Sequence, residues 1–293
     1  MLQRGGSLLR TPESGPGSAL ITDKAAHIFL LNLDQTMKKQ TVLVTGSTSG
    51  IGLAIARAFA GKGCNIIFNG LEPTGEQIAA EVATQHSIDY LFFPANMLQP
   101  ASLRDMVNKS IQRFGAVDVL VNNAGIQHVA PLEAFPEDKW DAIIAINLTA
   151  AFHLSKAVWP KMKEQHFGRI INIASAHGLI ASEYKSAYVA AKHGLVGLTK
   201  TAALEGATCG ITCNAICPGY VKTPLVDQQI AEQATVHHLP ETEVVEKVIL
   251  KKQAIKQFVS ADTIAQLCLF LSSETAATIT GAAMPIDGGW SAQ

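Results

Sequence analysis

Tyr188 and Lys192 lie four positions apart, a spacing that can create a proton-transferring tyrosine. A tyrosine hydroxyl normally titrates near pH ~10, so its use as a base near neutrality requires the phenolate to be stabilised by about 4 kcal/mol. On a helix, side chains four positions apart share a face, and an ammonium group there can supply part of this stabilisation. Tyr184, by contrast, is followed at this spacing by Tyr188. We therefore expect Tyr188 to transfer a proton and Lys192 to lower its pKa.

Ser175 and Lys185 lie close to this pair in the sequence. Ser175 ends the apolar run GRIINIA, and its hydroxyl would orient a substrate oxygen and stabilise charge developing on it. Lys185 lies one helical turn before Tyr188 and would serve another purpose. If the substrate carries a carboxylate, this ammonium would anchor one end of it while Tyr188 and Ser175 hold the reacting end. The alternative is that Tyr188 and Lys192 are ordinary surface residues of a helix.

Three further polar side chains follow strand-like segments. Gln127 follows NNAGI, His177 comes shortly after Ser175, and Gln229 follows PGYVKTPL. Each alone would more often be an ordinary loop or surface residue. Together with Lys185 they are candidates to surround a carboxylate.

Gly46, Gly50 and Gly52 separate the apolar run TVLV from an alanine-rich stretch with helical character. Small residues at this point allow backbone N–H groups to approach a pyrophosphate at the positive end of a helix. Glycines also occur at strand-to-helix turns for geometry alone, but their position after a strand and before a helix is the one that phosphate binding requires. We therefore expect a dinucleotide cofactor.

The identity of the cofactor depends on the charges near this loop. A cofactor with a 2′-phosphate would require Arg or Lys in the glycine loop or just after the second strand. TGSTSGIG contains no basic residue, and FNGLEPTGEQ offers Glu72 and Glu76 but no cation. NAD is therefore favoured over NADP.

The bulk composition excludes several classes of partner. Lys and Arg number 23 against 24 Asp and Glu, so the net charge is −1 and no basic cluster stands out. Nucleic acid and membrane surfaces are therefore not expected as partners. The five cysteines lack the paired spacing of a secreted disulfide framework, which favours a reducing, cytoplasmic compartment. Cys209, Cys213 and Cys217 recur every four residues in strand-like sequence, where alternating side chains do not favour a metal cluster, so no metal is expected.

The chain divides into a short leading segment and one α/β domain. Residues 1–36 mix Gly, Ser and Pro, and we expect a disordered extension before Met37. Arg4 and Arg10 would suit a targeting peptide, but several acidic residues in the segment argue against one. From residue 37 to 293, short β-branched runs alternate with helical stretches such as 50–63, 100–115, 138–165 and 186–207. This alternation predicts a single doubly wound Rossmann-type domain, with a parallel sheet and helices on both faces.

Ligands of doubly wound sheets bind beyond the carboxyl ends of the strands, where the candidate residues stand. The strand-like runs are TVLVTG, NIIFNG, DYLFFPAN, VDVLVNNAG, GRIINIAS and GITCNAICPG. Residues 224–257 resemble a pair of amphipathic helices and would form a small substrate lid that excludes water. An ordinary surface helix pair is the alternative for this segment.

The glycine spacing, G-x-x-x-G-x-G, resembles that of the short-chain dehydrogenases and reductases. NNAG at 122–125, Asn147, Ser175, the Tyr188/Lys192 pair and PGYVKT at 218–223 strengthen the resemblance, which extends from about Met37 to the C-terminus. It implies that Asn147, Ser175, Tyr188 and Lys192 are catalytic, with Asn147 holding a water of the proton relay and Lys192 binding the nicotinamide ribose. It also implies a homotetramer.

The resemblance assigns cofactor contacts to positions around the predicted strand ends. With Tyr188 and Lys192, these are Gly46, Ser49, Gly50, Ile51, Gly52, Leu71, Asn96, Asn123, Ala124, Gly125, Pro218, Gly219, Val221 and Thr223. Two positions depart from the family pattern. The acidic residue that usually closes the second strand is absent, and Asn96 replaces the usual Asp after the third strand, where its side-chain oxygen would still accept a hydrogen bond from adenine.

Within this family, NNAGIQH, NIASAHGLIAS and IDGGWSAQ resemble the D-3-hydroxybutyrate dehydrogenases of bacteria. That resemblance implies NAD-dependent oxidation of (R)-3-hydroxybutyrate to acetoacetate. The implied substrate contacts are Gln127, Ser175, His177, Lys185, Tyr188, Tyr220, Gln229 and Trp290. Tyr220 stands where those enzymes often have Trp. The alternatives are an NADPH-dependent reductase of 3-oxoacyl thioesters and a non-catalytic dinucleotide-binding protein.

Overall fold

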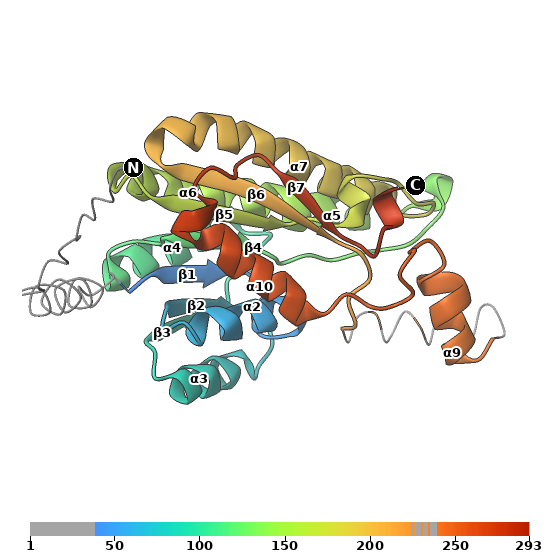
Figure 1. Ribbon diagram of the computed structural model, residues 1–293, viewed down its shortest axis with the longest axis horizontal. Helices are drawn as coiled ribbons and strands as arrows, with labels where there is room; N and C mark the ends of the chain where they lie inside the picture. The colour runs from blue at the N-terminus through green and yellow to red at the C-terminus, as the bar shows by residue number, and fades with distance from the viewer. Residues whose placement is uncertain (1–38, 224–225, 227–229, 231–233, 235–238, 293) are drawn as a thin grey trace, which may run out of the picture. The chain divides into compact units, whose positions relative to one another are not determined.

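Seven parallel strands form the sheet that carries the candidate residues. A computed structural model describes residues 39–223, 226, 230, 234 and 239–292 (Figure 1). Its strands are β1 (Thr41–Val44), β2 (Asn65–Asn69), β3 (Tyr90–Phe93), β4 (Val119–Asn122), β5 (Gly168–Ile173), β6 (Ile211–Pro218) and β7 (Ala283–Ile286). They are ordered β3-β2-β1-β4-β5-β6-β7. The doubly wound fold and the six strands predicted from apolar runs are confirmed.

β7 is a strand that the sequence analysis did not identify. Its four residues include Pro285, which pairs with Cys217 of β6. Proline cannot donate a hydrogen bond within a sheet, so it occurs mainly on edge strands, and β7 is the last strand in the order. Because of this proline, the sequence pattern did not predict β7, which lies against the predicted ligand-binding end of β6.

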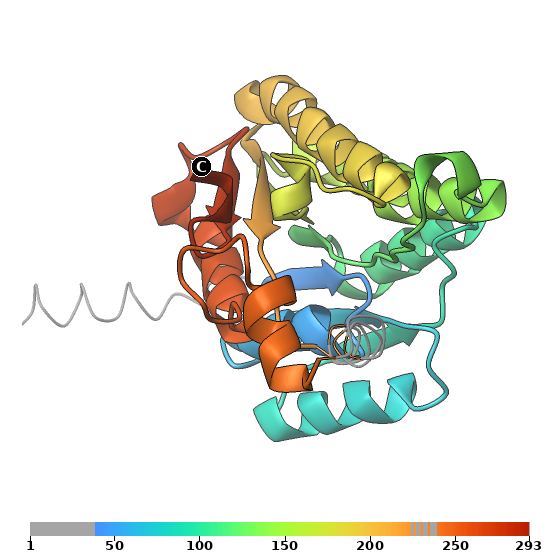
Figure 2. The ribbon, with the colours of Figure 1, turned by 90° about the vertical axis from the view of Figure 1, so that its right-hand side faces the viewer.

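Helices cover both faces of the sheet, as the alternating pattern predicted (Figure 2). One face carries α2 (Gly50–Ala60), α3 (Gly75–His86) and α10 (Ala261–Ser272). The other carries α4 (Pro100–Phe114), α6 (Ala150–Glu164) and α7 (Ser186–Gly206). Val42 and Val44 of β1 belong to the first apolar core and Leu43 to the second, because successive strand residues point to opposite faces.

A buried polar chain ties α7 to the centre of the sheet. Asn122 and Asn172 face each other in the register of β4 and β5, and Asn122 Nδ2 donates to Asn172 Oδ1 at 2.8 Å. Asn172 Nδ2 in turn donates to Thr199 Oγ1 of α7 at 2.8 Å. Buried amides must pair, so these bonds fix the register of the strands and the rotation of α7, whose first turns carry Tyr188 and Lys192.

α5 (Glu137–Ile144) and α6 form one helical stretch joined by a π-helical turn, Ala145–Thr149. Of the helices in the described part of the chain, this stretch alone is long and apolar enough to cross a membrane by length and composition. Helices in the cores of globular proteins pass the same test, and here α6 packs against α4 while α5 packs against α7. The π-helical turn contains Asn147.

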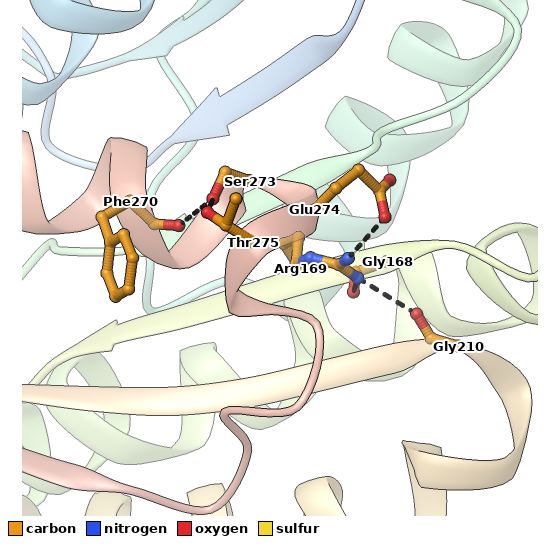
Figure 3. Close-up of polar contacts among 7 residues, drawn as sticks. All are labelled: Gly168, Arg169, Gly210, Phe270, Ser273, Glu274 and Thr275. Atoms are coloured by element: carbon orange, nitrogen blue, oxygen red, sulfur yellow. Dashed lines mark hydrogen bonds and ion pairs between the residues drawn. The ribbon is translucent and has the colours of Figure 1, made fainter. Parts of the chain in front are cut away.

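Arg169 forms a polar cluster at the starts of the strands, the end of the sheet opposite to the predicted site (Figure 3). Its side chain is 3% exposed, and one guanidinium nitrogen, Nη1, donates to the carbonyls of Gly168 (2.9 Å) and Gly210 (3.1 Å). Nη2 lies 4.0 Å from Glu274, in the turn that follows α10. Burial lowers the pKa of Arg169, and Glu274 opposes this effect. The cluster joins α10 to β5 and β6.

The five cysteines all lie within the described residues, and Cys209, Cys213, Cys217 and Cys268 form no disulfide. Cys213 and Cys217 are buried in β6, where burial raises their pKa values to about 12 and about 11. Across the residues that the structure describes, no three metal-ligating side chains form a cluster. Buried thiols with such pKa values stay protonated and behave as small apolar groups.

Candidate active site

One cavity of about 490 Å³ lies at the carboxyl ends of the strands. It is lined by most of the predicted site residues, namely Gly46, Ser49, Gly50, Ile51, Leu71, Asn96, Asn123, Ala124, Gly125, Gln127, Ser175, His177, Lys185, Tyr188, Lys192, Pro218, Gly219, Tyr220, Val221, Thr223 and Trp290. Gly52 and Asn147 are outside its lining, and Gln229 lies outside the described residues. The glycine loop therefore shares one cavity with three of the four predicted catalytic residues, Ser175, Tyr188 and Lys192.

The glycine loop forms the cradle that a pyrophosphate requires. Gly46 and Gly50 have φ values of +61° and +52°, a backbone region that favours glycine. A Cβ at Gly52 would overlap the Gly46 carbonyl oxygen, so this residue lets α2 start directly beneath the loop. The N–H groups of the first turn of α2 are thus available to an anion at the positive helix end. This geometry fits a dinucleotide.

Asn69 closes β2 near the position where the family usually has an acidic residue, and its side-chain amide binds groups within the protein. Asn69 Nδ2 donates to the carbonyls of Phe93 (3.0 Å) and Ala95 (2.9 Å), and its Oδ1 accepts from Gly46 N–H (3.2 Å). These bonds join the ends of β2 and β3 to the glycine loop. Asn69 lines the cavity, and the sequence analysis did not assign it to the site.

Glu72 is a second lining residue that was not assigned to the site. It follows β2 by three residues, and its carboxylate accepts a short hydrogen bond from Thr48 Oγ1 of the glycine loop. The hydrogen bond holds the Glu72 carboxylate beside the glycine loop. In the sequence, Glu72 was visible as an acidic residue after the second strand, but it indicated only that no basic residue is present there to bind a 2′-phosphate.

Asn96 lines the cavity with its side-chain oxygen already in use. Its Oδ1 accepts from Leu98 N–H at 2.9 Å and thereby forms a local turn after β3. The predicted adenine contact through this oxygen would have to share it with that turn, because a carbonyl oxygen has two lone pairs.

Asn123 and Ala124 join β4 to the glycine loop. Thr45 Oγ1 accepts from the backbone N–H groups of both residues at 2.9 Å. Asn123 Nδ2 donates to the carbonyls of Thr45 (2.9 Å) and Gly46 (3.1 Å). The asparagine side chain therefore holds the loop in place beside the cavity.

Asn147 is held by reciprocal bonds with the chain that follows β4. Its Nδ2 donates to the Ile126 carbonyl and its Oδ1 accepts from Ile126 N–H, both at 2.9 Å. With Lys192 it lines a second cavity of about 10 Å³. That volume is about the space of one water molecule, and both side chains are polar.

Tyr188 and Lys192 are neighbours, but the electrostatic prediction for the tyrosine was wrong. Lys192 Nζ lies 5.6 Å from the Tyr188 ring centroid and donates to the Ile173 carbonyl at 2.8 Å. Burial raises the pKa of Tyr188, a hydrogen bond with Ser175 opposes this, and Tyr220 adds to it. Burial also lowers the pKa of Lys192 to about 8. Burial therefore sets the direction of the Tyr188 pKa, and the Lys192 ammonium is directed at the Ile173 carbonyl.

Ser175 and His177 form one short turn after β5. Ser175 Oγ accepts from His177 N–H at 3.1 Å, and His177 Nε2 lies 2.9 Å from Ser182 Oγ. Burial lowers the pKa of His177 to about 3, with smaller contributions from Lys185, Lys252 and His193. His177 is therefore a neutral hydrogen-bonding group that fixes the Ser175 hydroxyl.

Tyr220 and Trp290 form an aromatic wall beside the lysine. Their rings stack with centroids 5.6 Å apart and an interplanar angle of 5°. Lys185 Nζ lies 5.5 Å from the Tyr220 ring centroid, and the His177 ring meets Trp290 edge-on at 5.0 Å. Burial, followed by the charge of Lys252, lowers the pKa of Lys185 to about 8. Lys252 is a cation of this region that the sequence analysis did not identify.

The sequence profile of the short chain dehydrogenase family matches residues 40–234. A D-beta-hydroxybutyrate dehydrogenase of Rhizobium meliloti (strain 1021) is 52% identical over 256 residues, which are 87% of this chain and 99% of that protein. The protein of the same name from Cupriavidus necator is 51% identical over 254 residues, covering 87% of this chain and 98% of that protein.

More distant relatives share the fold. A 3-oxoacyl-[acyl-carrier-protein] reductase of Thermotoga maritima is 32% identical over 255 residues, covering 86% of this chain and 98% of that protein. A crystal structure of an actinorhodin polyketide ketoreductase variant with NADPH superimposes with a TM-score of 0.83 at 31% identity. The match covers 88% of this chain and 99% of the ketoreductase.

Proposed function

The chain belongs to the short-chain dehydrogenase family, and we propose that it catalyses the reversible, NAD-dependent oxidation of (R)-3-hydroxybutyrate to acetoacetate. The observation that carries the proposal is that Lys185 lines the same cavity as Ser175 and Tyr188. A half-buried ammonium beside the reacting groups suits a small substrate with a carboxylate. The names of the two relatives at 52% and 51% identity support the same substrate.

In this proposal, the chain's own residues position the hydroxyl and move its proton. Ser175 Oγ, held by His177 N–H, binds the substrate oxygen, and the Tyr188 oxygen takes the hydroxyl proton as the carbonyl forms. NAD, when bound in the cavity beside the glycine loop, would supply the acceptor for the hydride from the carbon that carries the substrate hydroxyl. Because burial raises the pKa of Tyr188, this residue is most readily the acid of the reverse reaction, and oxidation is expected to gain from higher pH until Lys185 loses its charge at about pH 8.

Lys185 is proposed to hold the carboxylate, with Gln127 and His177 as further polar contacts. His177 stays neutral because burial lowers its pKa to about 3, so the charge opposite the carboxylate comes from Lys185. The aromatic wall of Tyr220 and Trp290 would cover the short carbon chain. Gln229 is proposed as another contact from the sequence alone.

NAD is proposed over NADP because of Glu72. Its carboxylate lines the cavity and is held by Thr48 of the glycine loop. A carboxylate near the adenosine ribose can accept hydrogen bonds from its hydroxyls and would repel a 2′-phosphate.

The rival activity, reduction of 3-oxoacyl thioesters with NADPH, is separated by one pair of assays. Purified protein is assayed with NAD and (R)-3-hydroxybutyrate, and with NADPH and acetoacetyl thioester. The proposal expects much the larger kcat/KM in the first assay. Robust turnover in the second assay alone would refute it.

Two substitutions test the assigned roles. Tyr188→Phe removes the proton-transferring hydroxyl, and we expect turnover to fall by at least about a hundredfold. Unchanged turnover would instead favour a non-catalytic dinucleotide-binding protein.

Lys185→Ala should lower kcat/KM for the hydroxy acid by roughly a hundredfold, the scale of a charged hydrogen bond, while calorimetry gives an unchanged Kd for NAD. Equal kcat/KM would refute the anchor.

We also propose a cytoplasmic homotetramer. Three helices expose large apolar side chains, with Phe152 on α6 45% exposed, Leu204 on α7 82% and Phe270 on α10 44%. Such side chains suit contacts between copies of the chain, and thiols outside any disulfide, such as those of Cys213, Cys217 and Cys268, suit a reducing compartment. Light scattering on the purified protein measures the oligomeric state.

A further inference from the structure

Gln253 is a buried amide that lies behind the aromatic wall of the cavity. It is 1% exposed and belongs to the segment that follows a π-helical turn, Val245–Ile249. It is not a lining residue of the cavity, yet it contacts both chain segments that carry the wall. A buried polar side chain in such a place requires partners, and those partners indicate its purpose.

Both ends of the Gln253 amide are used. Its Oε1 accepts from Tyr220 N–H at 3.2 Å. Its Nε2 donates to the carbonyls of Ile255 (3.2 Å) and Gln257 (2.9 Å). One acceptor and two donors are satisfied together, which fixes the orientation of the amide.

Through this contact Gln253 holds the backbone of Tyr220. The Tyr220 N–H is bound by Gln253, and the Tyr220 carbonyl accepts from Val259 N–H at 2.8 Å. The ring held in this way stacks on Trp290 and lies beneath Lys185 Nζ. The same ring packs on an apolar cluster made of Val226, Ile230, Val244, Ile249 and Leu250. A shift of the Tyr220 backbone would therefore move the aromatic wall and, with it, the ring over which the Lys185 ammonium lies.

Gln253 also reaches the turn that carries Trp290. A Cβ at Gly288 would lie 3.0 Å from Gln253 Nε2, and a Cβ at Gly219 would lie 2.9 Å from Gln253 Oε1. Ile255 N–H donates to the Gly288 carbonyl at 2.9 Å, so the segment after Gln253 binds this turn directly. Glycines at these two positions leave the space that the amide fills.

We propose that Gln253 is a positioning residue that sets the shape of the substrate end of the cavity, and with it the selectivity for short hydroxy acids. It acts through Tyr220 and Trp290 and touches no reacting atom. The statement about selectivity rests on the proposed function. The statement about geometry does not, because the wall exists whatever the substrate is.

The enzymatic test uses two acids that differ by one methylene, 3-hydroxybutyrate and 3-hydroxypentanoate. Gln253→Met has a side chain of similar length without the amide. We expect it to lower the ratio of kcat/KM values, short acid over long acid, by at least about fivefold, as expected for the loss of one buried hydrogen bond. Lys256→Met is the matched control, because Lys256 Nζ donates to the carbonyls of Leu250, Lys251 and Gln253 without touching Tyr220.

A merely structural role would change thermal stability in both variants and the ratio in neither. An unchanged ratio in folded Gln253→Met, or an equal change in Lys256→Met, would overturn the proposal. In Gln253→Glu, one oxygen can still accept from Tyr220 N–H, and the protonated acid can donate to one of the two carbonyls that Nε2 binds in the wild type. If Gln253→Met does not fold, Gln253→Glu provides the test. A wild-type ratio of kcat/KM values, short acid over long acid, would then support the proposal, and a lowered ratio would refute it.

A measurement without substrate separates this proposal from the proposed function. Trp140→Phe and Trp159→Phe together leave Trp290 as the fluorescent tryptophan of a chain with three. We expect Gln253→Met to change the emission of Trp290 in this background and Lys256→Met to leave it unchanged. Unchanged emission in both would refute the positioning role. A changed emission in a protein that does not oxidise 3-hydroxybutyrate would refute the proposed substrate alone.

Discussion

Lys185 and Lys192 show how two lysines near one tyrosine acquire different tasks. Burial lowers the pKa of each to about 8. Lys192 Nζ donates to the carbonyl of Ile173 at the end of β5, whereas Lys185 Nζ lies over the Tyr220 ring. The four-residue spacing distinguished Lys192 from Lys185 as the partner of Tyr188. It predicted a lowered pKa for Tyr188, whereas burial raises this pKa, because spacing carries no information about burial.

The pKa of Lys185 predicts how reduction of acetoacetate depends on pH. A lysine is charged below its pKa, so the proposed anchor for the carboxylate would be charged below about pH 8 and uncharged above it. We expect kcat/KM for acetoacetate to fall by up to about tenfold per pH unit above 8, because this parameter reports the free enzyme. In Lys185→Arg the side chain stays charged, so the fall should disappear. A fall that persists in Lys185→Arg would assign it to Lys192 instead.

His177 makes a prediction about stability. Its pKa is lowered to about 3 in the folded protein, so between pH 6.5 and about 3 the unfolded chain binds a proton that the folded protein does not. Stability is therefore full above pH 6.5 and declines below it, by about 1.4 kcal/mol per pH unit from this residue. Urea unfolding of the wild type and His177→Gln at pH 6.5 and 4.5 measures the difference. Equal losses in both would contradict the assignment.

At the scale of elements, the turn between β2 and α3 determines the cofactor end of the cavity. Asn69 joins the strand ends to the glycine loop, and Glu72 is bonded to Thr48 of that loop. Their side chains face residues far away in the sequence. A local pattern could therefore show that no cation is present, but it could not show which side chains meet.

Glu72→Gln removes a negative charge with little change of shape. We expect the preference for NAD over NADP, as a ratio of kcat/KM values, to fall by about tenfold, the scale of a partly screened charge pair. Thr48→Val is the control, because it removes the hydrogen bond and keeps the charge. The preference should survive in this control. An unaltered preference in Glu72→Gln would show that Glu72 does not discriminate.

Sequence patterns predicted the elements better than the contacts between them. Apolar runs ending in Gly, Asn or Pro identified six strands because a buried parallel strand needs such a run. β7 was missed because Pro285 contradicts the pattern of a strand, and Lys252 was missed because only tertiary packing brings its charge near Lys185 and His177. Gln253 has no local signature, since its partners lie in three segments.

At the scale of the whole molecule, the two ends of the sheet serve different purposes. The carboxyl ends of the strands carry the cavity, and the opposite end carries the Arg169 cluster (Figure 3). Stability and chemistry should therefore be separable by substitution.

Arg169→Ala should lower the free energy of unfolding by about 3 kcal/mol, because it leaves a cavity and removes two buried hydrogen bonds. kcat/KM should stay unchanged, since the cluster lies at the other end of the sheet. Glu274→Gln is the control and should cost no more than about 0.5 kcal/mol, because Glu274 is 80% exposed and 4.0 Å away. Chemical denaturation together with assays checks both. A large fall in kcat/KM for folded Arg169→Ala would contradict the separation.

The π-helical turn at Ala145–Thr149 also has a meaning for how this chain is compared with others. Such a turn amounts to one surplus residue inserted into an α-helix. Deleting one residue there would restore a regular helix with little rotation of its two flanking segments, and would change which side chain faces Ile126. Asn147 would then lose Ile126, although the helix itself would remain intact. A one-residue gap at this place in a sequence alignment would therefore distinguish chains that keep the hydrogen bonds between Asn147 and Ile126 from chains that keep only the fold.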